Sequence, residues 1–249
     1  MARALDRDRL LAAFDEIGRA ATAARTRLEI AVYGGSALML ASNFRYETED
    51  VDVGTIEYHW PQWLLDVVER IGAENGWASD WFNDAVTFHL SPLADRAADY
   101  LEFGTFPRSN EAPGLIVSVP SASYLLALKL KAIRVTDPLR GEQERLDILN
   151  LMRVLKIRTI DEAIAELARY FPVSAAAAEK QRFLLKHMNL DGAVDAPKYP
   201  GRGRSARSFR RASGDSAGGI RRYLSARARF CGAICLHRGG AAALRQCAS

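Results

Sequence analysis

The sequence predicts an α/β (α+β) fold, with a core of strands and helices, a helical C-terminal part and a basic tail. Patterns typical of strands alternate with helical periodicity in the first part of the chain, then helical periodicity continues alone. The composition changes abruptly after Pro197. We therefore expect a core over 1–120, a helical part packed on it over 121–190, and a largely disordered tail over 191–249.

Local patterns place the elements of the core. Residues 5–27 carry apolar side chains at helical spacing and predict an amphipathic helix. The apolar run 29–33 stops at glycines and predicts a strand, and the helix formers of 36–42 predict a helix directly after that turn. Residues 50–56 alternate and contain valines, which predicts a second strand. A proline at the first turn favours a helix over 61–75.

Later elements are mostly helical. The apolar run 115–119 predicts a third strand, and a leucine-rich helix is expected over 121–134. A further helix is expected over 142–155. Thr159, followed three residues later by a glutamate, fits a capping box and opens a helix to about residue 170. The last helix of the body is expected over 174–187.

Charge is distributed unevenly along the chain. The net charge is +4, yet residues 197–249 contain twelve basic residues and one acid, a net charge of +11. The rest has 22 basic and 29 acidic residues, a net charge of −7. Two interpretations of the tail stay open. Its arginines could bind RNA phosphates with salt-dependent affinity, or a shifted reading frame near the end of a GC-rich gene could have produced it.

The cysteines and the hydropathy bear on the compartment. All three cysteines lie in the tail, so the body has no disulfide framework and fits a reducing cytoplasm. The sequence has no apolar stretch long enough to span a membrane, and its start has no apolar region typical of a secretory signal. We therefore expect a cytoplasmic protein without a membrane partner.

Two carboxylates, Asp50 and Asp52, stand one residue apart on a predicted strand. Residues i and i+2 of a strand point to the same face, roughly 6–7 Å apart, so both side chains can reach one cation. Mg²⁺ in proteins is bound by one or two carboxylates together with substrate phosphates. This pair therefore predicts a Mg²⁺ site, although an Asp-x-Asp strand is also compatible with a solvated face.

A glycine-rich turn precedes the pair and completes the pattern. Gly34 and Gly35 allow a tight turn and close approach of a phosphate, and Ser36 adds a hydroxyl donor. The helix that follows directs free N–H groups and the positive end of its dipole at an anion. Arg45 could contact a triphosphate bidentately. Together these parts fit nucleotidyl transfer, in which metal ions align attack on the α-phosphate of an NTP.

These motifs resemble the nucleotidyltransferase superfamily related to DNA polymerase β. The similarity is greatest to the bacterial branch with the AbiEii-type toxins of type IV toxin–antitoxin systems and the DUF6036 proteins. It is carried by five segments within residues 28–157: Gly34 to Leu40, Arg45 to Val53, Trp81 to Val86, Leu126 to Arg134 and Arg145 to Leu151.

The resemblance implies a small mixed β-sheet core, Mg²⁺, and transfer of NMP from NTP to a tRNA or protein acceptor. It also implies a toxin whose partner is an antitoxin protein. Lys129 would match a basic residue that contacts phosphates, and Asp147 an acidic residue near the active site. Two other roles stay open: a solvated charge for Lys129, and for Asp147 a structural pair with Arg134 or Arg145.

The chain departs from the superfamily at the third carboxylate, which usually lies on a later strand. The strand predicted over 115–119 has no acid, and Glu102 and Asp84 are the candidates. If neither reaches the metal, the protein either uses a reduced site or binds nucleotide without turnover. Three functions therefore remain open: a nucleotidyltransferase, a catalytically degenerate nucleotide-binding or regulatory module, and a tail-driven RNA-binding protein.

Overall fold

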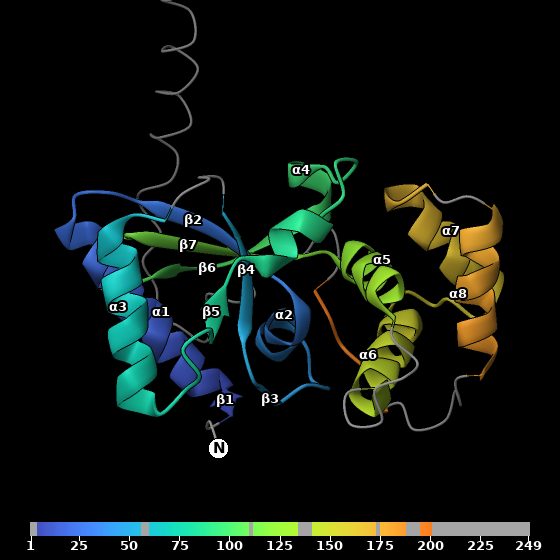
Figure 1. The fold of residues 1–249 in the computed structure, drawn as a ribbon, viewed down its shortest axis with the longest axis horizontal. Helices are drawn as coiled ribbons and strands as arrows, with labels where there is room; N and C mark the ends of the chain where they lie inside the picture. Colours follow the sequence, from blue (N-terminus) through green and yellow to red (C-terminus); the bar gives the residue numbers. More distant parts are fainter. Residues whose placement is uncertain are drawn as a thin grey trace, which may run out of the picture. The chain divides into compact units, whose positions relative to one another are not determined.

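A computed structural model describes residues 4–55, 60–109, 112–133, 141–172, 175–187 and 195–200. The chain divides into a compact unit, Met1–Phe209, and a second unit, Arg210–Ser249. All described residues belong to the first unit (Figure 1). The predicted basic tail beyond residue 200 lies outside the described residues, and so do its cysteines and the disorder and RNA binding expected of it.

Within the described residues, the central sheet has five strands in the order β5-β4-β2-β7-β6. The strands are β2 (Leu28–Val32), β4 (Val51–Thr55), β5 (Phe82–Asn83), β6 (Tyr100–Phe106) and β7 (Leu115–Pro120). Strand β2 is parallel to β7 and antiparallel to β4. Strand β5 is parallel to β4, and β6 is antiparallel to β7. The expected α/β architecture with a mixed sheet is therefore confirmed.

One face of this sheet is covered by helices α1 (Arg7–Ala23) and α3 (Gln62–Asn75), which lie side by side (Figure 1). Strand β2 alternates between buried and half-buried residues, as expected for a strand with one face in the core. Phe14 of α1 contacts Phe106 of β6 at 5.3 Å between ring centroids. The opposite face carries the side chains of β4 that matter for the site.

Shorter elements surround the sheet. Helix α2 (Gly34–Ala41) follows β2 directly, and the short strands β1 (Leu5–Asp6) and β3 (Glu47–Thr48) pair with each other. The 3₁₀ helix η1 (Ala85–His89) and helix α4 (Arg96–Asp99) lie between β5 and β6. The first helix starts later than expected because β1 precedes it and the Asp6 side chain caps it by accepting a hydrogen bond from the Arg9 N–H.

The helical part consists of α5 (Ala122–Ala132), α6 (Gly141–Val154), α7 (Ile160–Tyr170) and α8 (Ala175–His187). Helix α5 contacts β7, α6 and α7, and α8 packs against α7. Ser121 caps α5 by accepting a hydrogen bond from the Tyr124 N–H. The capping box predicted at Thr159 is confirmed, with Glu162 as its second member. The contact of α5 with β7 joins the helices to the sheet.

The segment 195–200 lies within the predicted tail, yet it contacts the body. The backbone N–H of Lys198 donates to Oδ1 of Asn43 at 2.7 Å. The hydroxyl of Tyr199 donates to the carbonyl of Pro120 at 2.8 Å, and the ring is half-buried. The disorder expected from residue 191 onward therefore does not hold for this segment.

Candidate active site at the start of helix α2

The glycine turn brings the start of α2 against the carboxylate of Asp52. Gly34 has a φ of +63°, the left-handed region that glycine adopts without steric cost. A Cβ built at Gly34 would lie 2.7 Å from Oδ2 of Asp52. Strands β2 and β4 enforce this proximity, because the Tyr33 N–H donates to the Asp52 carbonyl at 2.9 Å. The two sequence motifs therefore meet in one place.

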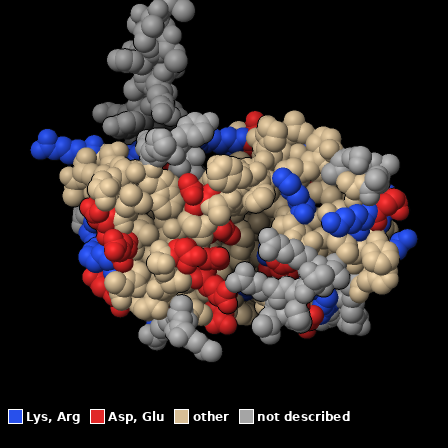
Figure 2. Space-filling view, in the orientation of Figure 1, with Lys and Arg blue, Asp and Glu red and all other residues tan. Residues whose placement is uncertain are grey.

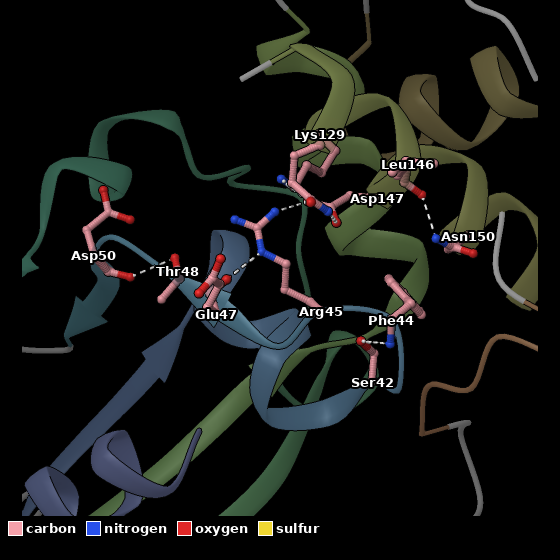
Figure 3. A network of polar contacts seen from close by, with 11 residues as sticks. Ser42, Phe44, Arg45, Glu47, Thr48, Asp50, Lys129, Leu146, Asp147 and Asn150 are labelled. Carbon is pink, nitrogen blue, oxygen red and sulfur yellow. Dashed lines mark hydrogen bonds and ion pairs between the residues drawn. The ribbon is translucent and has the colours of Figure 1, made fainter. Parts of the chain in front are cut away.

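Ser36 has a different use from the phosphate contact expected of it. Its side chain is buried, and its hydroxyl donates to the backbone carbonyl of Asp50 at 2.5 Å. The hydroxyl of Thr48 donates to the same carbonyl at 3.2 Å (Figure 3). Ser36 thus holds the backbone of Asp50 in place at the start of β4. The groups of the turn that can bind an anion are its backbone N–H groups.

The two predicted metal ligands lie close enough for their charges to interact. Asp50 directly precedes β4 and Asp52 lies within it, and both are half-buried. Burial raises the pKa of the Asp52 carboxyl to about 6, and the negative charge of Asp50 contributes in the same direction. The ammonium of Lys129 and a hydrogen bond from Asn83 favour the ionised form. Asp52 therefore sits between a like charge and a fixed cation.

Acidic side chains gather on the surface around this pair. Figure 2 shows them over strands β4 and β5. Asp80 and Asp84, on either side of β5, are both exposed. An acidic rim attracts cations and disfavours a bare triphosphate, so an anionic substrate would need positive charge supplied inside the site.

Arg45 supplies one such charge. Its Nε donates to the Glu47 carbonyl at 2.8 Å, and its Nη1 donates to Oδ2 of Asp147 at 3.2 Å (Figure 3). Its Nη2 lies 3.0 Å from the position of a Cβ built at Gly35. The guanidinium is therefore held in a fixed orientation over the first turn of α2, where a phosphate would bind.

Lys129 supplies the second charge and shares its anchor with Arg45. Its Nζ donates to Oδ2 of Asp147 at 2.9 Å, and Nε2 of Gln143 donates to Oδ1 at 3.1 Å. The Asp147 side chain is fully buried, whereas those of Lys129 and Arg45 are 14% and 19% exposed. A buried carboxylate with this many donors holds both cations in place (Figure 3).

The structure therefore brings Arg45, from the early part of the chain, together with Lys129 and Asp147, which lie about 85 to 100 residues later. Asp147 on α6 contacts Arg45 and Lys129, and the role that the resemblance implies for it stays a prediction. As for the structural pairs that were left open, Arg145 bonds to Glu142, with Nη2 and Oε1 2.6 Å apart, and Arg134 lies outside the described residues.

The two candidates for a third carboxylate do not complete a metal site. Glu102 lies on β6, which is separated from β4 by β7 and β2, a distance of about 14 Å across the sheet. Asp84 is exposed beyond the end of β5. In the part of the chain that the structure describes, no group of three or more His, Cys, Asp or Glu side chains could hold a metal ion.

The residues nonetheless fit a cation bound jointly with a substrate. Two carboxylates one residue apart, one of them with a raised pKa that a divalent cation would lower, form a donor set suited to Mg²⁺ plus phosphate oxygens. Gly34 lies against the Asp52 carboxylate, so a phosphate bound at the start of α2 would lie next to Asp52. Asp50 and Asp52 would hold the metal, and Gly34 and Gly35 would face the phosphates.

Sequence reasoning missed two polar residues of this site, Asn83 and Gln143. Asn83 lies opposite Asp52 on the neighbouring strand. The apolar pair that precedes it, Trp81 and Phe82, was a signal for a short buried strand, and both residues are in the core. Gln143 stands one helical turn before Asp147, a spacing at which side chains of a helix interact.

Comparisons with known proteins identify no family: no family model, curated protein or solved structure matches this chain. Among the described residues, no helix is both long and apolar enough to cross a membrane.

Proposed function

We propose that the protein is a Mg²⁺-dependent nucleotidyltransferase. The observation that supports this most strongly is the position of the Asp52 carboxylate against Gly34, where the charges of Asp50 and Lys129 act on it, with Arg45 beside Gly35. This arrangement combines carboxylates for a cation, a helix start for an anion and fixed positive charge, which are the needs of phosphoryl chemistry.

The triphosphate would bind between two groups of residues. The first turn of α2 offers N–H groups at Gly35 and its neighbours, and Arg45 lies over that turn. Lys129 faces the site from α5, and Asp147 restrains it. These groups hold the negative charge of the substrate in one orientation, so that the α-phosphate lies near Asp50 and Asp52.

In the reaction, the oxygen of an acceptor hydroxyl loses its proton to water and forms a bond to the α-phosphorus, and the bond from that phosphorus to the oxygen bridging to the β-phosphate breaks, which releases pyrophosphate. Mg²⁺, when bound, neutralises phosphate charge and aligns the attack. Arg45 and Lys129 stabilise charge that develops on the phosphate oxygens. Asp147 contributes by keeping both cations in position, which lowers the reorganisation that the reaction requires.

The acceptor and the cellular role rest on the resemblance alone. By that likeness, the acceptor is a tRNA or a protein, and the protein is the toxin of a type IV pair whose antitoxin is encoded next to it. The acidic rim over β4 and β5 does not choose between these acceptors.

Transfer of label from α-labelled NTPs tests the proposal. The full chain is incubated with Mg²⁺ and each NTP, with total tRNA or a cell protein extract as acceptor. We expect transfer by the wild type and by the control variant Asp84→Asn, and a loss of at least about 100-fold in the double variant Asp50→Asn/Asp52→Asn. Absence of transfer by the wild type, or equal transfer by the double variant, contradicts the proposal.

A second candidate is a nucleotide-binding module without turnover. The failure of Glu102 and Asp84 to reach the pair of carboxylates favours it. The two functions differ in one result. Calorimetric binding of an NTP that depends on Mg²⁺, combined with no label transfer to any acceptor, supports the module, whereas transfer excludes it.

A further inference from the structure

Asn83 occupies the place beside Asp52 where a third ligand would face the cation. Strand β5 is parallel to β4, with Phe82 opposite Val51 and Asn83 opposite Asp52. Neighbouring strands are about 4.8 Å apart, and residues opposite each other project from the same face. The side chain closest to Asp52 on this edge of the sheet is therefore an amide rather than a carboxylate.

The hydrogen bonds of this amide show which of its ends faces the carboxylate. Its Oδ1 accepts a hydrogen bond from the Ala85 N–H at 3.1 Å. Its Nδ2 donates to the Asp80 carbonyl at 3.3 Å, and the interaction of the amide with Asp52 favours the ionised carboxylate. An amide stabilises a carboxylate through the hydrogens of its NH₂ group. The oxygen of Asn83, the atom able to bind a cation, is thus turned away toward η1.

We propose that Asn83 is a positioning residue that orients Asp52, and that the site binds one divalent cation rather than two. This inference rests on the proposed function. Metal pairs that act on phosphates lie about 3.5–4 Å apart and need ligands for both ions. Asp50 and Asp52 supply carboxylates for one ion, and no third carboxylate joins them in the described residues.

The remaining buried carboxylate near the site cannot serve a second ion as it stands. Both oxygens of Asp147 accept hydrogen bonds, from Lys129, Arg45 and Gln143. The fixed charges of Lys129 and Arg45 lie where a second cation would otherwise neutralise the phosphates. In this site, the side chains of Lys129 and Arg45 therefore supply the positive charge that a second metal ion would otherwise supply.

Mn²⁺ provides a direct count of bound ions. The full chain is titrated with Mn²⁺ in the presence of a non-hydrolysable NTP analogue, and free Mn²⁺ is followed by electron paramagnetic resonance. We expect one bound Mn²⁺ in total per complex of protein and analogue, the ion that the carboxylates and the phosphates share. Two such ions overturn the inference but leave the proposed function standing, whereas no bound ion contradicts both.

Variants of Asn83 test its role separately from the count. Asn83→Asp keeps an oxygen that can accept from Ala85 but replaces the donor with a carboxylate beside Asp52, and it should bind a second Mn²⁺. Asn83→Ala should bind one Mn²⁺ about 10–100-fold more weakly, as for other residues that orient metal ligands. Thermal unfolding of each variant shows that it is folded. Wild-type affinity and an unchanged count in both folded variants would overturn the positioning role.

Discussion

The Asp52 carboxylate lies directly against the α-carbon of Gly34, at the junction of strand β2 and helix α2. A Cβ at Gly34 would be 2.7 Å from Oδ2 of Asp52, closer than real Cβ contacts permit. This contact couples the phosphate-facing turn to the cation-facing strand. Any side chain at residue 34 must therefore displace one of the two groups on which the proposed chemistry depends.

Substitution of Gly34 tests this coupling, and Gly76 offers a matched control. Both glycines have positive φ, +63° and +69°, but a Cβ at Gly76 would meet no atom within 4 Å. Gly34→Ala and Gly76→Ala should each lower the free energy of unfolding by about 1–2 kcal/mol through backbone strain. Only Gly34→Ala should also weaken binding of Mg²⁺ and NTP, by tenfold or more. Equal binding by the two variants would contradict the contact.

The pKa of Asp52 predicts how stability depends on pH. Because this pKa rises from 3.8 to about 6 on folding, the ionised carboxylate disfavours the folded state. The penalty is absent below about pH 4, grows between pH 4 and 6, and is complete above pH 6. Asp52→Asn removes it, so this variant should be more stable than the wild type at pH 8, by roughly 1–3 kcal/mol.

The same difference should vanish near pH 4, where the wild-type carboxyl is protonated in both states. Urea unfolding at pH 4, 6 and 8 measures it, with Asp84→Asn as the control for an exposed carboxylate. A stability gain for Asp52→Asn that is as large at pH 4 as at pH 8 would show that the carboxylate is not strained by burial and by Asp50.

The sequence was sufficient to predict that the glycine turn lies close to the Asp-x-Asp pair, whereas the role of these residues in binding stays a prediction. Both patterns can be read locally. A glycine is favoured where φ is positive, and residues i and i+2 of a strand lie on the same face. The helix that contains Asp147 could also be placed from apolar periodicity. The partners of Asp147 could not, since its contact with Arg45 depends on where α6 lies relative to the segment that follows α2.

Strands β5 and β6, which the sequence did not predict, have no such local pattern. Strand β5 is two residues long, and its pairing with β4 is what makes it a strand. Strand β6 contains Gly104 beside a register shift and alternates poorly. Without these strands, neither the place of Asn83 nor the distance of Glu102 from the site could be predicted. Tertiary pairing, rather than propensity, decides both.

Asp147 should matter for stability as well as for binding. Asp147→Asn removes the charge that compensates Lys129 and Arg45 while it keeps the shape of the side chain. Loss of one partner of a buried ion pair is costly, so the free energy of unfolding should fall by about 2–4 kcal/mol, and the affinity for NTP should fall with it. Guanidinium unfolding and calorimetry measure the two effects.

Glu142 on the same helix provides the control for Asp147. Its side chain is 63% exposed and pairs with Arg145, whose side chain is 14% exposed. Glu142→Gln should lower stability far less than Asp147→Asn and leave NTP affinity unchanged, because water solvates the exposed carboxylate. If Asp147→Asn behaves like this control, the buried carboxylate does not hold the two cations in the way described.

The contacts of Tyr199 predict where the chain can be shortened. A chain that ends after residue 200 keeps the hydrogen bond from Tyr199 to Pro120 and the contact of Lys198 with Asn43. A chain that ends after residue 194 loses both and should be less stable by roughly 1–2 kcal/mol. Equal melting temperatures of the two chains would mean that this segment does not stabilise the body.

Calorimetric titration of an NTP into the full chain, with Mg²⁺ and then with a chelator, shows whether Asp50 and Asp52 share a cation with the nucleotide. We expect binding in Mg²⁺ that weakens at least tenfold in the chelator, and an affinity of Asp52→Asn in Mg²⁺ no higher than that of the wild type in the chelator. Binding of equal strength in all three conditions would contradict a cation shared by Asp50 and Asp52, and so would the absence of binding by the wild type in Mg²⁺.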